Sequence, residues 1–124
     1  MFEISVEETF SAGHALRGYK GKCENVHGHN YRVRVIMAGE KLDPTGLLMD
    51  FSQLKHAMQG VIRSLDHRFL NDFAPFDSVN PSAENIARHI YEEILRQLGP
   101  SENAARISAI TVWETDTTAA TYRP

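Results

Sequence analysis

The sequence lacks long hydrophobic runs, an excess of basic residues and any pair of cysteines. No apolar stretch among its 124 residues approaches the roughly 20 that a membrane-spanning helix needs, so no membrane segment is expected. The 13 Lys and Arg against 16 Asp and Glu leave a formal net charge of −3, which argues against a general nucleic-acid binder. The single cysteine, Cys23, excludes an internal disulfide and fits a reducing compartment. Because the N-terminus also lacks the pattern of a secretory signal, we expect a cytoplasmic protein whose residues 1–124 form one domain.

Alternating apolar and polar residues predict strands near both ends of the chain. Phe2, Ile4 and Val6 alternate with polar residues, and the pattern continues toward Phe10. A second alternating run covers 31–37, and residues 106–123 predict two strands around a turn near Asp116. Residues 11–30 hold four glycines and scattered polar side chains, which indicates a long loop or irregular hairpin.

Two amphipathic helices are predicted between these strands. Asp50 stands as the N-cap of a helix over 51–65, with Gln53 placed as in a capping box. The residues Asn80-Pro81-Ser82 open a second helix with its apolar stripe over 83–98, which Gly99-Pro100 ends. The predicted fold is α+β, a four-stranded antiparallel sheet with two helices on one face in the order ββααββ. An open sheet of this size leaves its edges exposed, so self-association is expected.

Three histidines suggest a metal centre. His27 and His29 are separated by Gly28, and residues at i and i+2 of an extended chain point to the same side. With His14 from a neighbouring strand, three imidazoles with an open fourth position would suit catalytic zinc. The alternative, histidines without a ligand role, weighs about equally on spacing alone, and His56 and His89 fit ordinary helix positions.

Four further residues are candidates for chemistry. Cys23 lies four residues before His27, where a thiolate could bind metal, attack a substrate or accept a proton; a loop thiol without a role is the alternative. Asp66 and His67 are the parts of a proton relay, but such a pair is also common at helix ends. Glu114 could accept two N–H donors from a flat heterocycle, or be an ordinary exposed acid.

Six strings of the chain, in this order, resemble the 6-pyruvoyl-tetrahydropterin synthase / 6-carboxy-tetrahydropterin synthase family: FSAGHAL, CENVHGHNY, GLLMDFSQLK, LDHRFLND, NPSAENIA and VWETDTTAATY. The spacing C-x3-H-G-H is similar to the bacterial 6-carboxy-tetrahydropterin synthases of queuosine biosynthesis. The resemblance implies the tunnelling fold (T-fold), in which three subunits close a barrel and two rings commonly stack into a hexamer. Active sites in this family form between subunits.

The resemblance also implies residue roles. The matching positions are His14, His27 and His29 for zinc; Cys23, Asp66 and His67 for proton transfer; Glu114 for the pterin; and, from a neighbouring subunit, Ser82 and Glu84. The family often has Thr where Ser82 stands, which weakens that carry-over. The implied substrate is 7,8-dihydroneopterin triphosphate, and the implied products are 6-carboxy-5,6,7,8-tetrahydropterin, acetaldehyde and triphosphate. Charge and loop position make four residues candidates for the triphosphate: Arg17, Lys20, Lys22 and Arg68.

Two alternatives stay open on the same scaffold. One is a 6-pyruvoyl-tetrahydropterin synthase, which eliminates triphosphate without cleaving a carbon–carbon bond. The other is a non-catalytic zinc or pterin-binding module, which would not need the proton-transfer set. A three-histidine zinc hydratase is disfavoured because it leaves Cys23 and Glu114 without a task.

Overall fold

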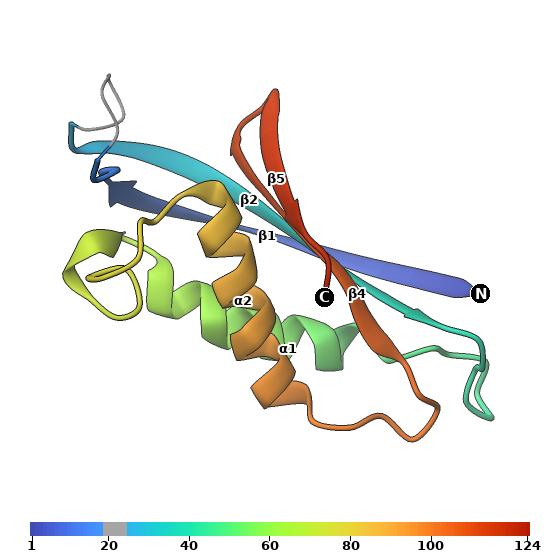
Figure 1. Ribbon diagram of the computed structural model, residues 1–124. Helices are drawn as coiled ribbons and strands as arrows, with labels where there is room; N and C mark the ends of the chain where they lie inside the picture. Colours follow the sequence, from blue (N-terminus) through green and yellow to red (C-terminus); the bar gives the residue numbers. More distant parts are fainter. Residues whose placement is uncertain (19–24) are drawn as a thin grey trace.

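A five-stranded sheet carries both long helices on one face (Figure 1). The structure, a computed structural model, describes residues 1–18 and 25–124. The elements are β1 (Phe2–His14), β2 (His27–Gly39), α1 (Phe51–Leu65), β3 (Arg68–Phe69), the 3₁₀ helix η2 (Leu70–Asp72), α2 (Ala83–Leu98), β4 (Arg106–Thr115) and β5 (Thr118–Tyr122). The strands lie in the order β3-β1-β2-β4-β5.

Both helices begin and end where the sequence predicts. The Asp50 carboxylate caps α1 by accepting the backbone N–H of Ser52 at 2.8 Å, and the Ser82 hydroxyl caps α2 by accepting the N–H of Asn85 at 3.2 Å. Gly99 ends α2 with a φ of 66°, a left-handed conformation that glycine adopts without a steric penalty. Each helix buries an apolar stripe against the sheet.

The sheet differs from the prediction in strand number. Four strands were expected, and these are β1, β2, β4 and β5, which pair antiparallel. The fifth, β3, has two residues and pairs in parallel with Ala12 and Gly13 of β1. A two-residue strand has too little periodicity to be recognised, because its pairing partner rather than its own sequence defines it.

Residues 11–30 were predicted as a long loop or irregular hairpin; the loop is wrong at both ends, where the segment forms a regular hairpin. Residues 11–14 belong to β1 and residues 27–30 belong to β2, and the two segments pair in register from Ser11↔Asn30 to His14↔His27. Gly13 lies opposite Gly28 within this ladder. Glycine usually weakens a strand, which is why the composition favoured a loop; here a long antiparallel ladder carries the pair. As a result, all three site histidines sit on regular strands.

The two faces of the sheet differ in character. The helix-covered face is apolar, with fully buried side chains such as Tyr31, Leu54 and Ile90. The other, which we call the open face, is polar: Arg34 donates to the Glu7 carboxylate at 2.7 Å, and the Arg32 guanidinium lies 3.8 Å from the Trp113 ring centroid. No helix among the described residues is long and apolar enough to cross a membrane.

Candidate metal and substrate site

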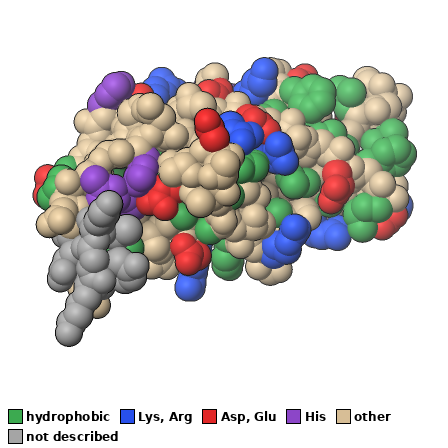
Figure 2. Space-filling model, turned by 90° about the horizontal axis from the view of Figure 1, so that it is seen from above, with side chains coloured by type: hydrophobic (Ala, Val, Ile, Leu, Met, Phe, Trp, Pro, Cys, Tyr) green, Lys and Arg blue, Asp and Glu red, His purple; other side chains and the backbone are tan. Residues whose placement is uncertain are grey.

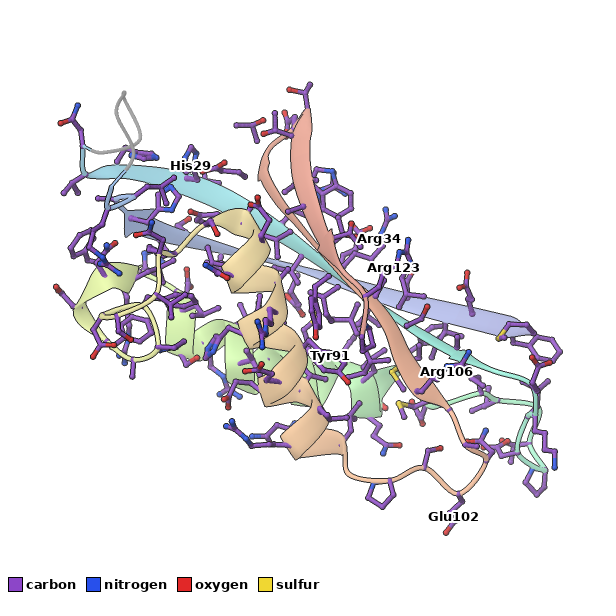
Figure 3. All side chains as sticks on the ribbon, viewed as in Figure 1. His29, Arg34, Tyr91, Glu102, Arg106 and Arg123 are labelled. Atoms are coloured by element: carbon purple, nitrogen blue, oxygen red, sulfur yellow. The ribbon has the colours of Figure 1, made fainter. Side chains whose placement is uncertain are left out.

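Four side chains from three strands converge at one end of the sheet. His14 is the last residue of β1, His27 and His29 begin β2, and Glu114 lies near the end of β4. Alternation along each strand places all four on the helix-covered face, in line with Phe10, Tyr31 and Val112. Figure 3 shows His29 at this end of β2, and Figure 2 shows histidine side chains gathered beside an acidic one.

The potential ligand atoms of these four residues, which we call the four-residue cluster, all lie within 4.8 Å of one another. The two Nε2 atoms of His14 and His27 are 2.9 Å apart. Glu114 Oε1 is 3.1 Å from His14 Nε2 and 3.0 Å from His29 Nε2. His14 is almost fully buried, with 1% of its surface exposed, whereas His29 and Glu114 keep a part of theirs open to solvent.

The outer nitrogens of two rings fix the protonation of the cluster. His14 Nδ1 lies 2.6 Å from the carbonyl oxygen of Pro81, and His27 Nδ1 lies 2.7 Å from that of Asn25. A carbonyl oxygen only accepts, so each Nδ1 carries the hydrogen. In a neutral ring, the Nε2 atom then carries a lone pair and no hydrogen. The lone pairs of His14, His27 and Glu114 point at one another across about 3 Å. Such an arrangement needs a shared proton or a cation at its centre.

The donor set fits a divalent metal of the zinc type. Imidazole nitrogen and carboxylate oxygen are both zinc ligands, and histidine ligands usually donate their second N–H to a carbonyl or carboxylate. His14 and His27 have that second bond. The expectation that His14, His27 and His29 lie together is therefore confirmed. Glu114 adds a fourth potential ligand atom, an oxygen, that the sequence did not predict to lie among the three nitrogens.

Burial and charge shape the titration of the groups in the cluster. Burial lowers the pKa of His29 below its ordinary value, and the neighbouring His14 and His27 act in the same direction, while Glu114 opposes them. Burial raises the pKa of Tyr31, and Glu114 adds to the shift. Both effects favour the neutral forms. The Tyr31 hydroxyl, below the rings of His14 and His29, is buried without a hydrogen-bond partner among the described residues.

Asp66 and His67 lie elsewhere, along the outer edge of β1. Asp66 accepts the backbone N–H of Ser11 at 2.8 Å, and the N–H of His67 donates to the carbonyl of the same serine at 2.6 Å. His67 Nε2 is 3.5 Å from the Asp66 carboxylate, so the predicted pair does form. The His67 side chain is 82% exposed, and its φ of 57° is uncommon for a residue other than glycine.

His67 and His29 both line a hollow of about 480 Å³ beside the ends of β1 and β2. The opposed Gly13 and Gly28 contribute no side chains there, and Ser11 and Asn30 stand at its rim. His67 is not one of the four clustered residues, although it shares this hollow with His29 of the same chain.

The remaining predicted residues fall into three groups. Ser82 uses its hydroxyl as the cap of α2, and Glu84 is exposed in the first turn of that helix. Arg17 donates to the carbonyl of Phe76 at 2.7 Å, and the Arg68 guanidinium lies 5.5 Å from the Phe73 ring centroid. Three predicted residues lie outside the described residues: Lys20, Lys22 and Cys23.

A cavity elsewhere in the described residues lies far from this chemistry. Its volume is about 630 Å³, and it lies between the C-terminal half of α2 and the start of β4. Figure 3 labels Tyr91, Arg106 and Arg123 in its wall, away from His29. None of the predicted site residues lines it. Size alone therefore does not identify the site, and the converging ligand atoms do.

Sequence reasoning missed the residues that support His14. They are the Pro81 carbonyl, which holds the imidazole, and the side chains of Asn71 and Asn80, which bind the backbone just after it. The strings LDHRFLND and NPSAENIA contain all three, but none of the three was considered for a role at the site. A carbonyl acceptor is present at every residue, so no sequence signal distinguishes the one at Pro81.

Comparisons with known proteins show a family and a fold that the chain shares. A family model described as 6-pyruvoyl tetrahydropterin synthase matches residues 3–124. A Bacillus subtilis protein named 6-carboxy-5,6,7,8-tetrahydropterin synthase is 36% identical over 128 residues, covering 99% of this chain and 86% of that protein. A Pyrococcus furiosus dihydroneopterin monophosphate aldolase is 36% identical over 111 residues, covering 90% and 88%. The solved Caenorhabditis elegans 6-pyruvoyl tetrahydropterin synthase superposes with a TM-score of 0.88 at 31% identity, covering 99% and 95%.

Proposed function

Because the chain belongs to the 6-pyruvoyl tetrahydropterin synthase family of enzymes, we propose that it converts 7,8-dihydroneopterin triphosphate and one water molecule to 6-carboxy-5,6,7,8-tetrahydropterin, acetaldehyde and triphosphate. The proposed setting is queuosine biosynthesis. The observation that carries the proposal is the four-residue cluster, in which one ligand atom from each of three histidines and a carboxylate oxygen all lie within 4.8 Å of one another. A relative of that name at 36% identity over nearly the whole chain supports the choice of product.

We propose zinc as the resident metal, held by His14, His27 and His29. When bound, the ion would acidify a side-chain hydroxyl of the substrate and polarise a carbonyl as it develops. The ordered Nδ1 hydrogen bonds of His14 and His27 support this assignment, since they aim Nε2 lone pairs at one point before any metal arrives.

The protein's own groups would bind the pterin and move the protons. Glu114 would accept the 2-amino and N3–H donors of the pterin ring, a donor pair that suits a carboxylate. Cys23 would take a proton from the substrate side chain, and His67 would shuttle protons with Asp66 fixing its tautomer. Ser82 and Glu84 would contribute from a neighbouring copy.

We also propose a homo-oligomer of three or six copies with active sites between them. Among the described residues, only Ala12 and Gly13 of β1 pair with a strand on the outer side, and β5 pairs on one side only. Unpaired edges of this kind invite pairing with a second chain. That His67 is not among the four clustered residues of its own chain supports the same idea. The partners would be this chain and a small molecule, in the cytoplasm, without nucleic acid.

Product identity tests the proposal against its two nearest alternatives. The C. elegans neighbour is named for a pyruvoyl product and the P. furiosus relative for an aldolase, so likeness alone does not select the reaction. We expect purified protein, incubated with 7,8-dihydroneopterin triphosphate, to release acetaldehyde and form a product with the mass of the carboxy-pterin. A pyruvoyl-pterin mass without acetaldehyde would assign the pyruvoyl reaction, and pterin binding without turnover would assign a binding module.

A further inference from the structure

The segment that follows His14 is held by two asparagine side chains in the same way. Asn71 accepts the backbone N–H of Ala15 at 3.0 Å and donates its own amide N–H to the Ala15 carbonyl at 2.8 Å. Asn80 accepts the N–H of Arg17 at 2.9 Å and donates to the Arg17 carbonyl at 2.8 Å. Each side-chain amide therefore satisfies both backbone groups of one residue, as a neighbouring strand would.

The second of these asparagines also belongs to the support of the His14 ring. Asn80 precedes Pro81, whose carbonyl lies 2.6 Å from His14 Nδ1. Asn85, one turn into α2, donates its side-chain N–H to the Asn80 carbonyl at 2.9 Å. The start of α2 thus holds both the ring of His14 and the backbone three residues further along the chain.

We propose that Asn71 and Asn80 are positioning residues for the metal centre, and we call the pair the asparagine clamp. The clamp acts through the backbone of Ala15 and Arg17. It fixes the end of β1 so that the His14 ring, held at Nδ1 by Pro81, directs Nε2 at His27 and Glu114. This inference rests on the proposed zinc site but on no particular reaction, so it can be tested without substrate.

The amide chemistry explains why asparagine is used. A carboxylate at position 80 would accept the Arg17 N–H but could not donate to the Arg17 carbonyl, and alanine would leave both groups without the partners they have in the structure. Loss of the clamp frees the end of β1, and an imidazole that is no longer pre-oriented binds metal less tightly. Changes to groups that orient metal ligands typically weaken metal affinity by about 10–100-fold.

Asn103 offers a matched control at the opposite end of the molecule. Its side-chain amide donates to the carbonyls of Lys41 at 3.0 Å and Leu48 at 2.9 Å, so it too ties loop backbone together. It touches no residue of the four-residue cluster, and its neighbour Glu102 lies far from His29 in Figure 3. Asn103→Ala removes a comparable number of hydrogen bonds without touching the metal centre.

The test measures zinc affinity by competition with a chromophoric chelator, together with the visible absorption spectrum of the cobalt-substituted protein. We expect Asn80→Ala to weaken zinc binding by about 10–100-fold and to change the cobalt spectrum, because His14 is no longer oriented. We expect Asn80→Asp, which keeps one of the two hydrogen bonds, to fall between Asn80→Ala and the unmodified protein. Asn103→Ala should keep the zinc affinity and the cobalt spectrum of the unmodified protein, even if its melting temperature falls as much as that of Asn80→Ala.

Three outcomes would overturn the proposal. The first is unmodified zinc affinity and cobalt spectrum in Asn80→Ala. The second is an equal loss in Asn103→Ala, which would indicate general destabilisation. The third is absence of tight zinc binding in the unmodified protein, which would also remove the proposed metal, whereas the first two leave the metal and the reaction standing. If Asn80→Ala does not fold, Asn71→Ala carries the same test, since Asn71 is not part of the α2 cap.

Discussion

Glu114 stands where a carboxylate could serve the metal, the pterin, or each in turn. Its Oε1 atom is about 3 Å from two imidazole nitrogens, and 29% of its side-chain surface remains exposed. A metal held by three histidines can use its fourth coordination position in catalysis only if that position stays open to the substrate. A permanent Glu114 ligand would close it. We therefore assign Glu114 to the pterin and His14, His27 and His29 to the metal, a division that can be measured.

Glu114→Gln separates these two roles. The amide offers one acceptor and one donor to a pterin edge that presents donors, so we expect KM to rise at least about tenfold, the cost of roughly one charge-assisted hydrogen bond. Zinc content should stay near one ion per chain, since the three histidines remain. Steady-state kinetics and elemental analysis give the two numbers, and Glu102→Gln, an exposed acid at the far end, is the control. Loss of zinc with an unchanged KM would make Glu114 a ligand instead.

At the scale of the helix, His89 links the stability of α2 to pH. It is half-buried, and its ring centroid lies 5.2 Å from that of Phe76. Burial lowers its pKa below the ordinary value of 6.5; Glu93 and Glu92 oppose the shift, and Arg96 adds to it. As pH falls below about 6.5, the unfolded chain binds a proton that the folded chain does not, so the free energy of unfolding decreases. Above that pH the contribution is constant.

We expect His89→Gln to reduce this dependence. Between pH 7.5 and pH 5.5, the urea midpoint of the unmodified protein should fall further than that of the variant, because glutamine does not titrate. The four-residue cluster is the same in both proteins, so any effect it has on the midpoint cancels in the difference. If the urea midpoints of the two proteins fall equally over this range, His89 takes up its proton equally in the folded and the unfolded state.

Most of the helices and strands could be predicted from the sequence, because the residue periodicity that marks them is local. The stripes of α1 and α2 and their capping residues, Asp50 and Ser82, predicted both helices to the residue. The ends of β1 and β2 were missed because their glycines resemble a loop, and what makes them strands is pairing between segments that are distant in sequence. The same limit applies at the site. The spacing of His27 and His29 indicated a ligand pair, but the place of Glu114 beside them depends on the order of strands across the sheet.

At the scale of the whole molecule, the two predicted halves of the site lie in different places. The four-residue cluster is on the helix-covered face, and the Asp66–His67 pair borders the hollow at the outer edge of β1. A proton shuttle has to reach its substrate to within hydrogen-bond distance. His29 of the same chain also lines that hollow. We propose that the His67 of one copy nevertheless acts at the cluster of another. The unpaired edge of β1 is where such a copy would approach.

Mixing two inactive variants tests this arrangement. His29→Ala lacks a proposed metal ligand and keeps His67, whereas His67→Ala keeps the four-residue cluster and lacks the shuttle. Each alone should lose nearly all activity. If sites form between copies, activity should return when the two variants are unfolded together in equal amounts and reassembled with zinc. About one site in four should be active, because half of the copies bring an intact cluster and half of their neighbours bring an intact His67. Reassembly of each variant by itself controls for the procedure. Mixed oligomers that form, as seen by native mass spectrometry, yet stay inactive would place the whole site within one chain.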